Sequence, residues 1–178
     1  MKLALTITLL AGLLALGACQ REAEAPPAPF AMTEDAMGRY CGMNVLEHPG
    51  PKGQVILAKY DEPVWFSSAR DAIAFTMLPE EPKDFRAIYV SDMGKAPSWE
   101  EPGVDNWIDA RQAFFVIGSD RKGGMGAAEA VPFSTEDAAQ AFTGDHGGRV
   151  VRFDDVPRDY ILEQDAASVA PTSSEEDD

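Results

Sequence analysis

The sequence predicts an α+β fold of two tandem ββαβ units related by an internal repeat, with a disordered N-terminal tether and an acidic C-terminal tail. Residues 64–76 and 131–143 are identical at seven of thirteen positions, at a constant offset of 67 residues. Runs of β-forming residues precede and follow both copies. Two such units, each with three strands and one helix, pack as an α+β arrangement.

The first unit follows from the patterns around the first copy. The run 55–60 (VILAKY) predicts a strand, and 64–66 (VWF) predicts a second. Ser67 is placed as the N-cap of an Ala-rich amphipathic helix that closes on Phe75. The run 87–90 (AIYV) then predicts the third strand.

The second unit repeats this order. Strands are predicted at 113–118 (AFFVIG), 131–133 (VPF) and 149–153 (RVVRF). Ser134 is placed as the N-cap of a helix that closes on Phe142.

The two units differ in one connection. Their first strands align at an offset of 58 residues and their helices at 67, which predicts about nine additional residues in the loop 119–129. Insertions that a scaffold does not need often carry function. This loop places Met125 within the sequence GGMG.

The N-terminus predicts export and lipidation. A short cationic start and an uncharged apolar run end in the letters LGAC, which resemble the lipobox of bacterial lipoproteins. Cleavage before Cys19 and acylation of that residue would anchor the protein to a membrane. An ordinary secretory signal with an incidental cysteine is the alternative.

The predicted organisation has five parts: a signal peptide (1–18), a lipid-anchored tether (19–31), the Cys-Gly-Met segment with the first unit and a linking stretch (32–111), the second unit (112–162) and a disordered acidic tail (163–178). The linking stretch, which contains Trp99 and Trp107, is expected to wrap across the two units.

Charge narrows the possible partners. The chain carries a net charge of −15, and loss of Lys2 with the signal peptide makes this about −16. Such a field disfavours nucleic acid and anionic lipid surfaces and favours cations or cationic partners.

Candidate chemistry centres on sulfur. Cys41 is the one thiol that remains if Cys19 is acylated. Cys41 and Met43 are two residues apart, so an extended backbone would project both sulfurs to one side. Thiolate and thioether form a soft pair that selects Cu(I), and Met125 could add a third sulfur. His48 could add an imidazole nitrogen, and a simple loop position is its alternative.

Each of these residues also has a structural interpretation. Cys41 could be a small buried core residue, and the methionines could fill gaps in the packing. His146, in the sequence DHGG, is interpreted as a turn residue. Met93, Tyr89 and the tryptophans of the linking stretch are interpreted as packing residues.

Several motifs together resemble the NosL family of bacterial lipoproteins, which are encoded with the maturation machinery of nitrous oxide reductase. They are the lipobox, the sequence YCGM at 40–43, WIDA at 107–110, GGMG at 123–126 and VPFS at 131–134. The resemblance covers 16–155, whereas the acidic tail is not part of the pattern.

The resemblance implies a Cu(I)-binding accessory protein with two ββαβ units, whose expected ligands are Cys41 and Met125, with Met43 matching by position. The implied cargo is one transiently bound Cu(I). The implied partners are apo nitrous oxide reductase and its membrane maturation machinery. The expected location faces the periplasm, on the inner leaflet of the outer membrane because Gln20 follows the lipidated cysteine, with the inner membrane as the alternative.

The leading hypothesis is therefore a copper chaperone rather than an enzyme. The rival is a thiol-dependent periplasmic enzyme that uses Cys41 as nucleophile or redox group, with a base such as His48 beside it. A third interpretation is a scaffold lipoprotein in which Cys41 is buried and binds no metal.

Overall fold

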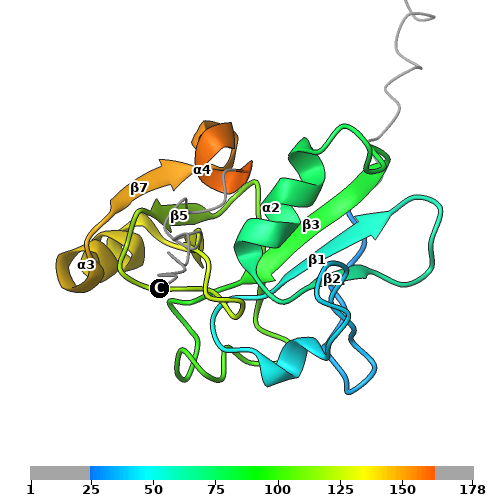
Figure 1. Ribbon diagram of the computed structural model, residues 1–178, viewed down its shortest axis with the longest axis horizontal. Helices are drawn as coiled ribbons and strands as arrows, with labels where there is room; N and C mark the ends of the chain where they lie inside the picture. Colours follow the sequence, from blue (N-terminus) through cyan, green and yellow to red (C-terminus); the bar gives the residue numbers. More distant parts are fainter. Residues whose placement is uncertain (1–24, 163–178) are drawn as a thin grey trace, which may run out of the picture.

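The computed structural model describes residues 25–162 and has the two expected units (Figure 1). The first contains β1 (Gly53–Leu57), β2 (Val64–Phe66), α2 (Ala69–Met77) and β3 (Phe85–Ser91). The second contains β5 (Phe114–Ile117), β6 (Val131–Phe133), α3 (Glu136–His146) and β7 (Arg149–Arg152). The remaining elements are η2 (Val45–Glu47), β4 (Trp107–Asp109), η3 (Phe153–Asp155) and α4 (Arg158–Leu162).

Each unit forms its own antiparallel sheet. The strand order is β2-β1-β3-β4 in the first sheet and β6-β5-β7 in the second. In both, the first strand of the unit lies between the second and the third. The α+β fold of two ββαβ units is therefore confirmed.

Strand register corrects the length of the insertion. Gly53 pairs with Phe66, and Phe114 pairs with the repeat-equivalent Phe133. Gly53 and Phe114 are 61 positions apart, whereas the two phenylalanines are 67 apart. The second connection is thus longer by six residues, not nine, because the first strand begins at Gly53 rather than at 55 and its counterpart begins at Phe114 rather than at 113.

The two units share one hydrophobic core. Phe75 of α2 and Val90 of β3 belong to the same buried cluster as Phe115 of β5 and Val151 of β7. In Figure 1, α2 lies in the middle of the molecule while α3 lies at its outer edge. The units are therefore packed against each other through α2.

Both helix caps lie one residue later than predicted. The N-cap of α2 is Ser68, whose hydroxyl accepts from Asp71 N at 3.0 Å, and not Ser67. The N-cap of α3 is Thr135, whose hydroxyl accepts from Ala138 N at 3.3 Å, and not Ser134. Each pair of neighbouring hydroxyl residues offers two equivalent candidates, and sequence alone does not separate them.

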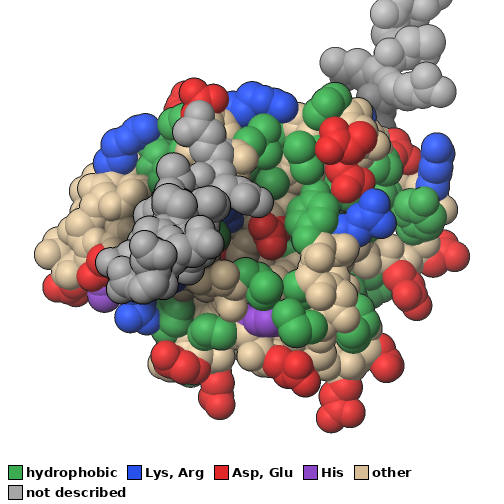
Figure 2. All heavy atoms as spheres, viewed as in Figure 1, with side chains coloured by type: hydrophobic (Ala, Val, Ile, Leu, Met, Phe, Trp, Pro, Cys, Tyr) green, Lys and Arg blue, Asp and Glu red, His purple; other side chains and the backbone are tan. Residues whose placement is uncertain are grey.

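The linking stretch contains a strand that the sequence analysis missed. Trp107–Asp109 forms β4 and pairs with the end of β3. Trp99 accepts a hydrogen bond from Gly50 N at its carbonyl, and its ring stacks on Phe142 of α3. The stretch therefore contacts both units, as expected, and its tryptophans are packing residues. Figure 2 shows acidic side chains along the lower edge of the molecule, below η2 and this stretch.

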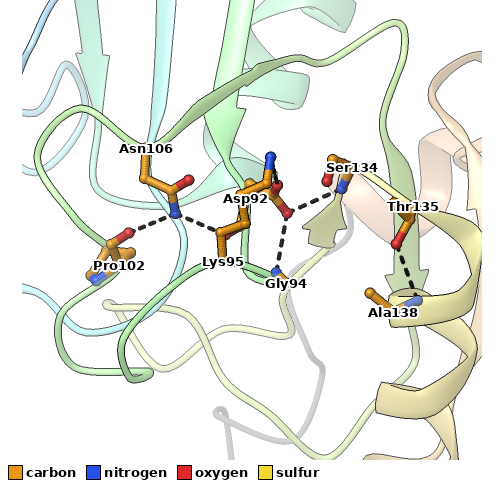
Figure 3. A network of polar contacts seen from close by, with 8 residues as sticks. All are labelled: Asp92, Gly94, Lys95, Pro102, Asn106, Ser134, Thr135 and Ala138. Carbon is orange, nitrogen blue, oxygen red and sulfur yellow. Dashed lines mark hydrogen bonds and ion pairs between the residues drawn. The ribbon is translucent and has the colours of Figure 1, made fainter.

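Asp92 joins the linking stretch to both units (Figure 3). Its buried Oδ1 accepts from Gly94 N and from Ser134 N, each at 3.1 Å. Its carbonyl accepts from the Asn106 side chain at 2.8 Å, and Lys95 pairs with Oδ2 at 3.0 Å. Burial raises the pKa of Asp92, but the hydrogen bonds from Ser134 and Lys95 outweigh burial and hold it below its ordinary value.

The predicted signal peptide, Cys19 and the acidic tail lie outside the described residues. Between residues 25 and 162, no helix has both the length and the apolar character needed to cross a membrane.

Candidate functional site

Cys41 lies in a tight turn, not on an extended strand. Met37 and Asn44 form an isolated antiparallel bridge, and between them Gly42 N donates to Gly38 O at 2.9 Å. Gly42 has a φ of 65°, a left-handed conformation that glycine adopts without strain. The predicted extended backbone from Cys41 to Met43 is therefore wrong, because the chain reverses at Gly42.

The turn holds the thiol against the backbone and leaves the thioether exposed. A Cβ at Gly38 would lie 2.5 Å from Cys41 Sγ, so the sulfur fills the space that this glycine leaves. The thiol is half-buried and donates a 3.8 Å hydrogen bond to the Met43 carbonyl. The Met43 side chain is 40% exposed. Both residues are therefore partly accessible to solvent.

The inserted loop forms a second tight turn, with Met125 at its tip. Gly126 N donates to Gly123 O at 2.8 Å, and Gly123 N donates to Ala127 O at 2.9 Å. Gly126 has a φ of 80°. Met125 is 54% exposed, so it contributes little to the core. Its exposure contradicts the interpretation of this methionine as core filler.

The inserted loop packs against His48 and against the N-cap residue of α2. A Cβ at Gly124 would lie 2.6 Å from His48 Cβ, and one at Gly123 would lie 3.4 Å from Ser68 Cβ. Glycine at these two positions lets the loop backbone approach both residues closely.

On the cysteine side, the ring of Tyr40 lies 5.6 Å from that of Phe66, two residues before the α2 cap. Burial, together with the nearby Glu81 and Asp71 carboxylates, raises the pKa of Tyr40. Asp71 lies in the first turn of α2. The Cys41 segment thus contacts β2 just before α2, and the Met125 loop contacts the N-cap of α2.

His48 lies between these segments and has an unused ring nitrogen. Its Nε2 is buried and has no hydrogen-bond partner among the described residues. A buried polar atom without a partner is uncommon and often marks a ligand position. His48 therefore stays a candidate ligand beside the three sulfurs.

A buried lysine supports the backbone around His48. The ammonium group of Lys52 donates to the carbonyl oxygens of His48, Pro49 and Gly50, at 2.6, 3.2 and 2.5 Å. Burial lowers the pKa of Lys52 to about 8, although the Glu129 carboxylate opposes this. The turn after His48 is therefore fixed from inside the protein.

A buried glutamate supports the base of the Met125 loop. Glu129 Oε1 accepts from Arg70 N at 2.8 Å, in the first turn of α2, and from Ala130 N at 2.9 Å. Arg70 also donates through Nη1 to the Ala128 carbonyl at 3.0 Å. Burial raises the pKa of Glu129 to about 8. The inserted loop is thereby attached to the first unit.

The sequence analysis missed both Lys52 and Glu129. Lys52 lies one residue before β1 and Glu129 two residues before β6, where strand alternation offers no signal for a buried charged side chain. The repeat carried one clue, because Glu129 is equivalent to Glu62 at the same offset of 67 residues. Glu62 is exposed, so the clue is incomplete.

His146 is the last residue of α3 rather than a turn residue. Its Nδ1 lies 3.0 Å from Asp120 Oδ1, at the start of the inserted loop. Within residues 25–162, no three or more His, Cys, Asp and Glu side chains gather where they could hold a metal. Thioether sulfur is a further type of ligand, and it favours soft ions such as Cu(I).

Comparison with known proteins identifies the family. The NosL family model matches residues 29–161. The copper-binding lipoprotein NosL of Achromobacter cycloclastes is 44% identical over 179 residues, covering 99% of this chain and 93% of the relative. That of Stutzerimonas stutzeri is 38% identical over 166 residues, covering 91% and 84%. The crystal structure of the copper chaperone NosL from Shewanella denitrificans has a TM-score of 0.70 at 35% identity, covering 75% of this chain and 98% of that one. The chain belongs to the NosL family.

Proposed function

We propose that this protein is a copper chaperone that binds one Cu(I) through Cys41, Met43 and Met125, with His48 as a further candidate ligand. Its relatives are named copper-binding lipoproteins and a copper chaperone. The observation that carries the proposal is the contact between Gly124 and His48, which brings the Met125 loop to the segment that follows Met43.

The donor set favours Cu(I) over harder ions. Thiolate and thioether are soft ligands, whereas calcium, magnesium and manganese prefer oxygen. The exposed methionines can rotate toward a bound ion at little cost to the core. The buried attachments of Lys52 and Glu129 limit how far the two segments can separate.

Delivery is proposed to occur by ligand exchange. A three-coordinate Cu(I) leaves room for a sulfur or nitrogen of the acceptor to bind before a donor leaves. The proposed acceptor is apo nitrous oxide reductase, together with its membrane maturation machinery. Acylated Cys19 would hold the protein at a membrane facing the periplasm, and fractionation of cells that express Cys19→Ser tests this anchor.

Anaerobic titration of the lipidated protein in detergent, against a chromophoric Cu(I) chelator, tests copper binding. Cys41→Ser should abolish tight binding, and Met43→Ala or Met125→Ala should weaken it by about tenfold or more, because each removes one donor of three. Met37→Ala is the matched control, since Met37 is as exposed as these residues and lies in the same turn region. Equal loss in the Met37 variant, or unchanged affinity in Cys41→Ser, would contradict the ligand set.

The alkylation rate of Cys41 in the copper-free protein distinguishes a copper chaperone from a thiol-dependent enzyme. Cys41 donates its hydrogen bond to a backbone carbonyl. A carbonyl can accept from a thiol, but it has no hydrogen to donate to a thiolate and so does not stabilise the nucleophilic form. The copper-free protein should therefore react with iodoacetamide no faster than a small-molecule thiol. Reaction faster by about a hundredfold would favour the enzyme instead.

A further inference from the structure

A pocket of about 250 Å³ is lined by residues of η2, of the segment after it and of the linking stretch. Its apolar lining includes Met32, Leu46 and Val104, and the last two are 39% and 46% exposed. The pocket is smaller than the roughly 300–1,000 Å³ sites that enclose drug-sized ligands. It fits a side chain of a partner better than a whole small molecule.

Acidic residues surround this pocket. Glu100 and Glu101 line it, Glu47 is next to Leu46 in η2, and Asp105 is next to Val104.

Lys52 does not offset this acidic charge at the surface. It is the one lysine or arginine in the pocket lining, and it is buried with its ammonium group bound to three carbonyl oxygens. An occupant of the pocket therefore meets negative charge around an apolar centre.

His48 connects this pocket to the proposed copper site. Its side chain lines the pocket and also contacts Gly124, the residue before Met125. A partner segment bound in the pocket would therefore be separated from the Met125 loop by His48. That placement is what an incoming copper ligand on the same partner requires.

We propose that the pocket is the docking site for the protein that accepts the copper, and that it receives an apolar side chain flanked by Lys or Arg. This inference rests on the proposed chaperone function. The apolar centre supplies contact area, and the acidic rim supplies attraction and orientation. Anionic membranes are disfavoured by the same rim, and a second copy of this acidic chain would repel it.

Binding of lipidated, copper-loaded protein to two probes tests the proposal. The probes are apo nitrous oxide reductase and its detergent-solubilised maturation complex. We expect wild-type protein to bind one of them, and Glu100→Lys/Glu101→Lys to bind it about tenfold or more weakly at low salt. Val104→Ser should weaken binding by a smaller factor that does not depend on salt, because it removes apolar contact.

Asp61→Lys/Glu62→Lys is the matched control, because these neighbouring acidic residues are equally exposed but lie in the turn between β1 and β2. It should bind like wild type. The docking site is wrong if the two double variants behave alike, if wild-type protein binds neither probe, or if it binds anionic vesicles or itself through these residues.

Cu(I) affinity measured on the same samples keeps the two proposals apart. It should be unchanged in all three variants. Loss of affinity in Glu100→Lys/Glu101→Lys would make the pocket part of the copper site and overturn docking. Failure of wild-type protein to bind Cu(I) would overturn the chaperone function instead.

Discussion

The two ββαβ units have the same order of elements but bury them differently. In α2 the buried residues run from Ala69 to Phe75, whereas in α3 the buried residue is Ala139. Glu62 of the first unit is exposed, while the equivalent Glu129 of the second is 1% exposed. Equivalent positions therefore acquire different roles because α2 lies between the units and α3 lies outside them.

The largest expected effect tests this difference in the helices. Phe75→Ala should cost about 3–5 kcal/mol of the free energy of unfolding, since Phe75 is 1% exposed in the shared core. Phe142→Ala, at the equivalent position of α3, should cost about 1–2 kcal/mol, because its ring is partly exposed. Urea unfolding measures both. Equal losses would show that α3 contributes as much to the core as α2.

The next effect tests the connection between the units. Asp92→Ala should cost about 3 kcal/mol, because it removes acceptors from two backbone amides and leaves them buried. Asp105→Ala, an exposed residue of the same linking stretch, is the control and should change stability by less than about 0.5 kcal/mol. Urea unfolding at neutral pH measures both. A small loss in Asp92→Ala would mean that the linking stretch contributes little to holding the units together.

The repeat explains why the fold could be predicted. Two copies of one pattern, each with strand-forming runs on both sides, identify ββαβ units better than either copy alone. The β4 strand was missed because Trp107–Asp109 is short and follows a stretch with several prolines. The sequence pattern does not predict the difference in burial between α2 and α3, because that difference depends on how the two units pack against each other.

The candidate site likewise has features that the sequence predicts and features that depend on tertiary packing. Cys41, Met43 and Met125 were recognisable because sulfur chemistry and an interrupted repeat appear directly in the sequence. The contact of the Met125 loop with His48, through Gly124, depends on tertiary packing and was not predicted. The buried charges of Lys52 and Glu129 were missed because a charged residue beside a strand is usually exposed.

A third prediction uses the two equivalent glutamates. The pKa of Glu129 is raised to about 8 by burial, so the fold favours its neutral form. Its contribution to stability is greatest below the unfolded pKa of about 4.5 and is lost as pH rises toward 8. The stability of Glu129→Gln relative to wild type should therefore increase between about pH 5 and about pH 8, by up to about 1.4 kcal/mol per pH unit.

Glu62→Gln is the matched control and should show no such slope, because Glu62 is exposed. Lys52 adds little slope below about pH 7, since it is mostly protonated there in both folded and unfolded protein. Urea unfolding across this pH range measures the slopes. Parallel curves for the Glu129 variant and wild type would show that the carboxylate is ionised in the folded protein at all these pH values.

The smallest effect concerns the helix caps. Ser68→Ala should cost about 1–2 kcal/mol, because the hydroxyl caps a partly buried helix end at 3.0 Å. Thr135→Ala should cost about 0.5–1 kcal/mol, since its cap is exposed and longer, at 3.3 Å. Ser67→Ala should change stability by less than about 0.5 kcal/mol. Ser134→Ala should cost about 1 kcal/mol without affecting the cap, because the Ser134 side chain also hydrogen-bonds the buried Asp92 carboxylate. Thermal and urea unfolding of the variants test the first cap assignment: a larger loss in Ser67→Ala than in Ser68→Ala would return the α2 cap to the position that the sequence predicted. For α3 the test is Thr135→Ala itself, and an unchanged stability in that variant would contradict the Thr135 cap.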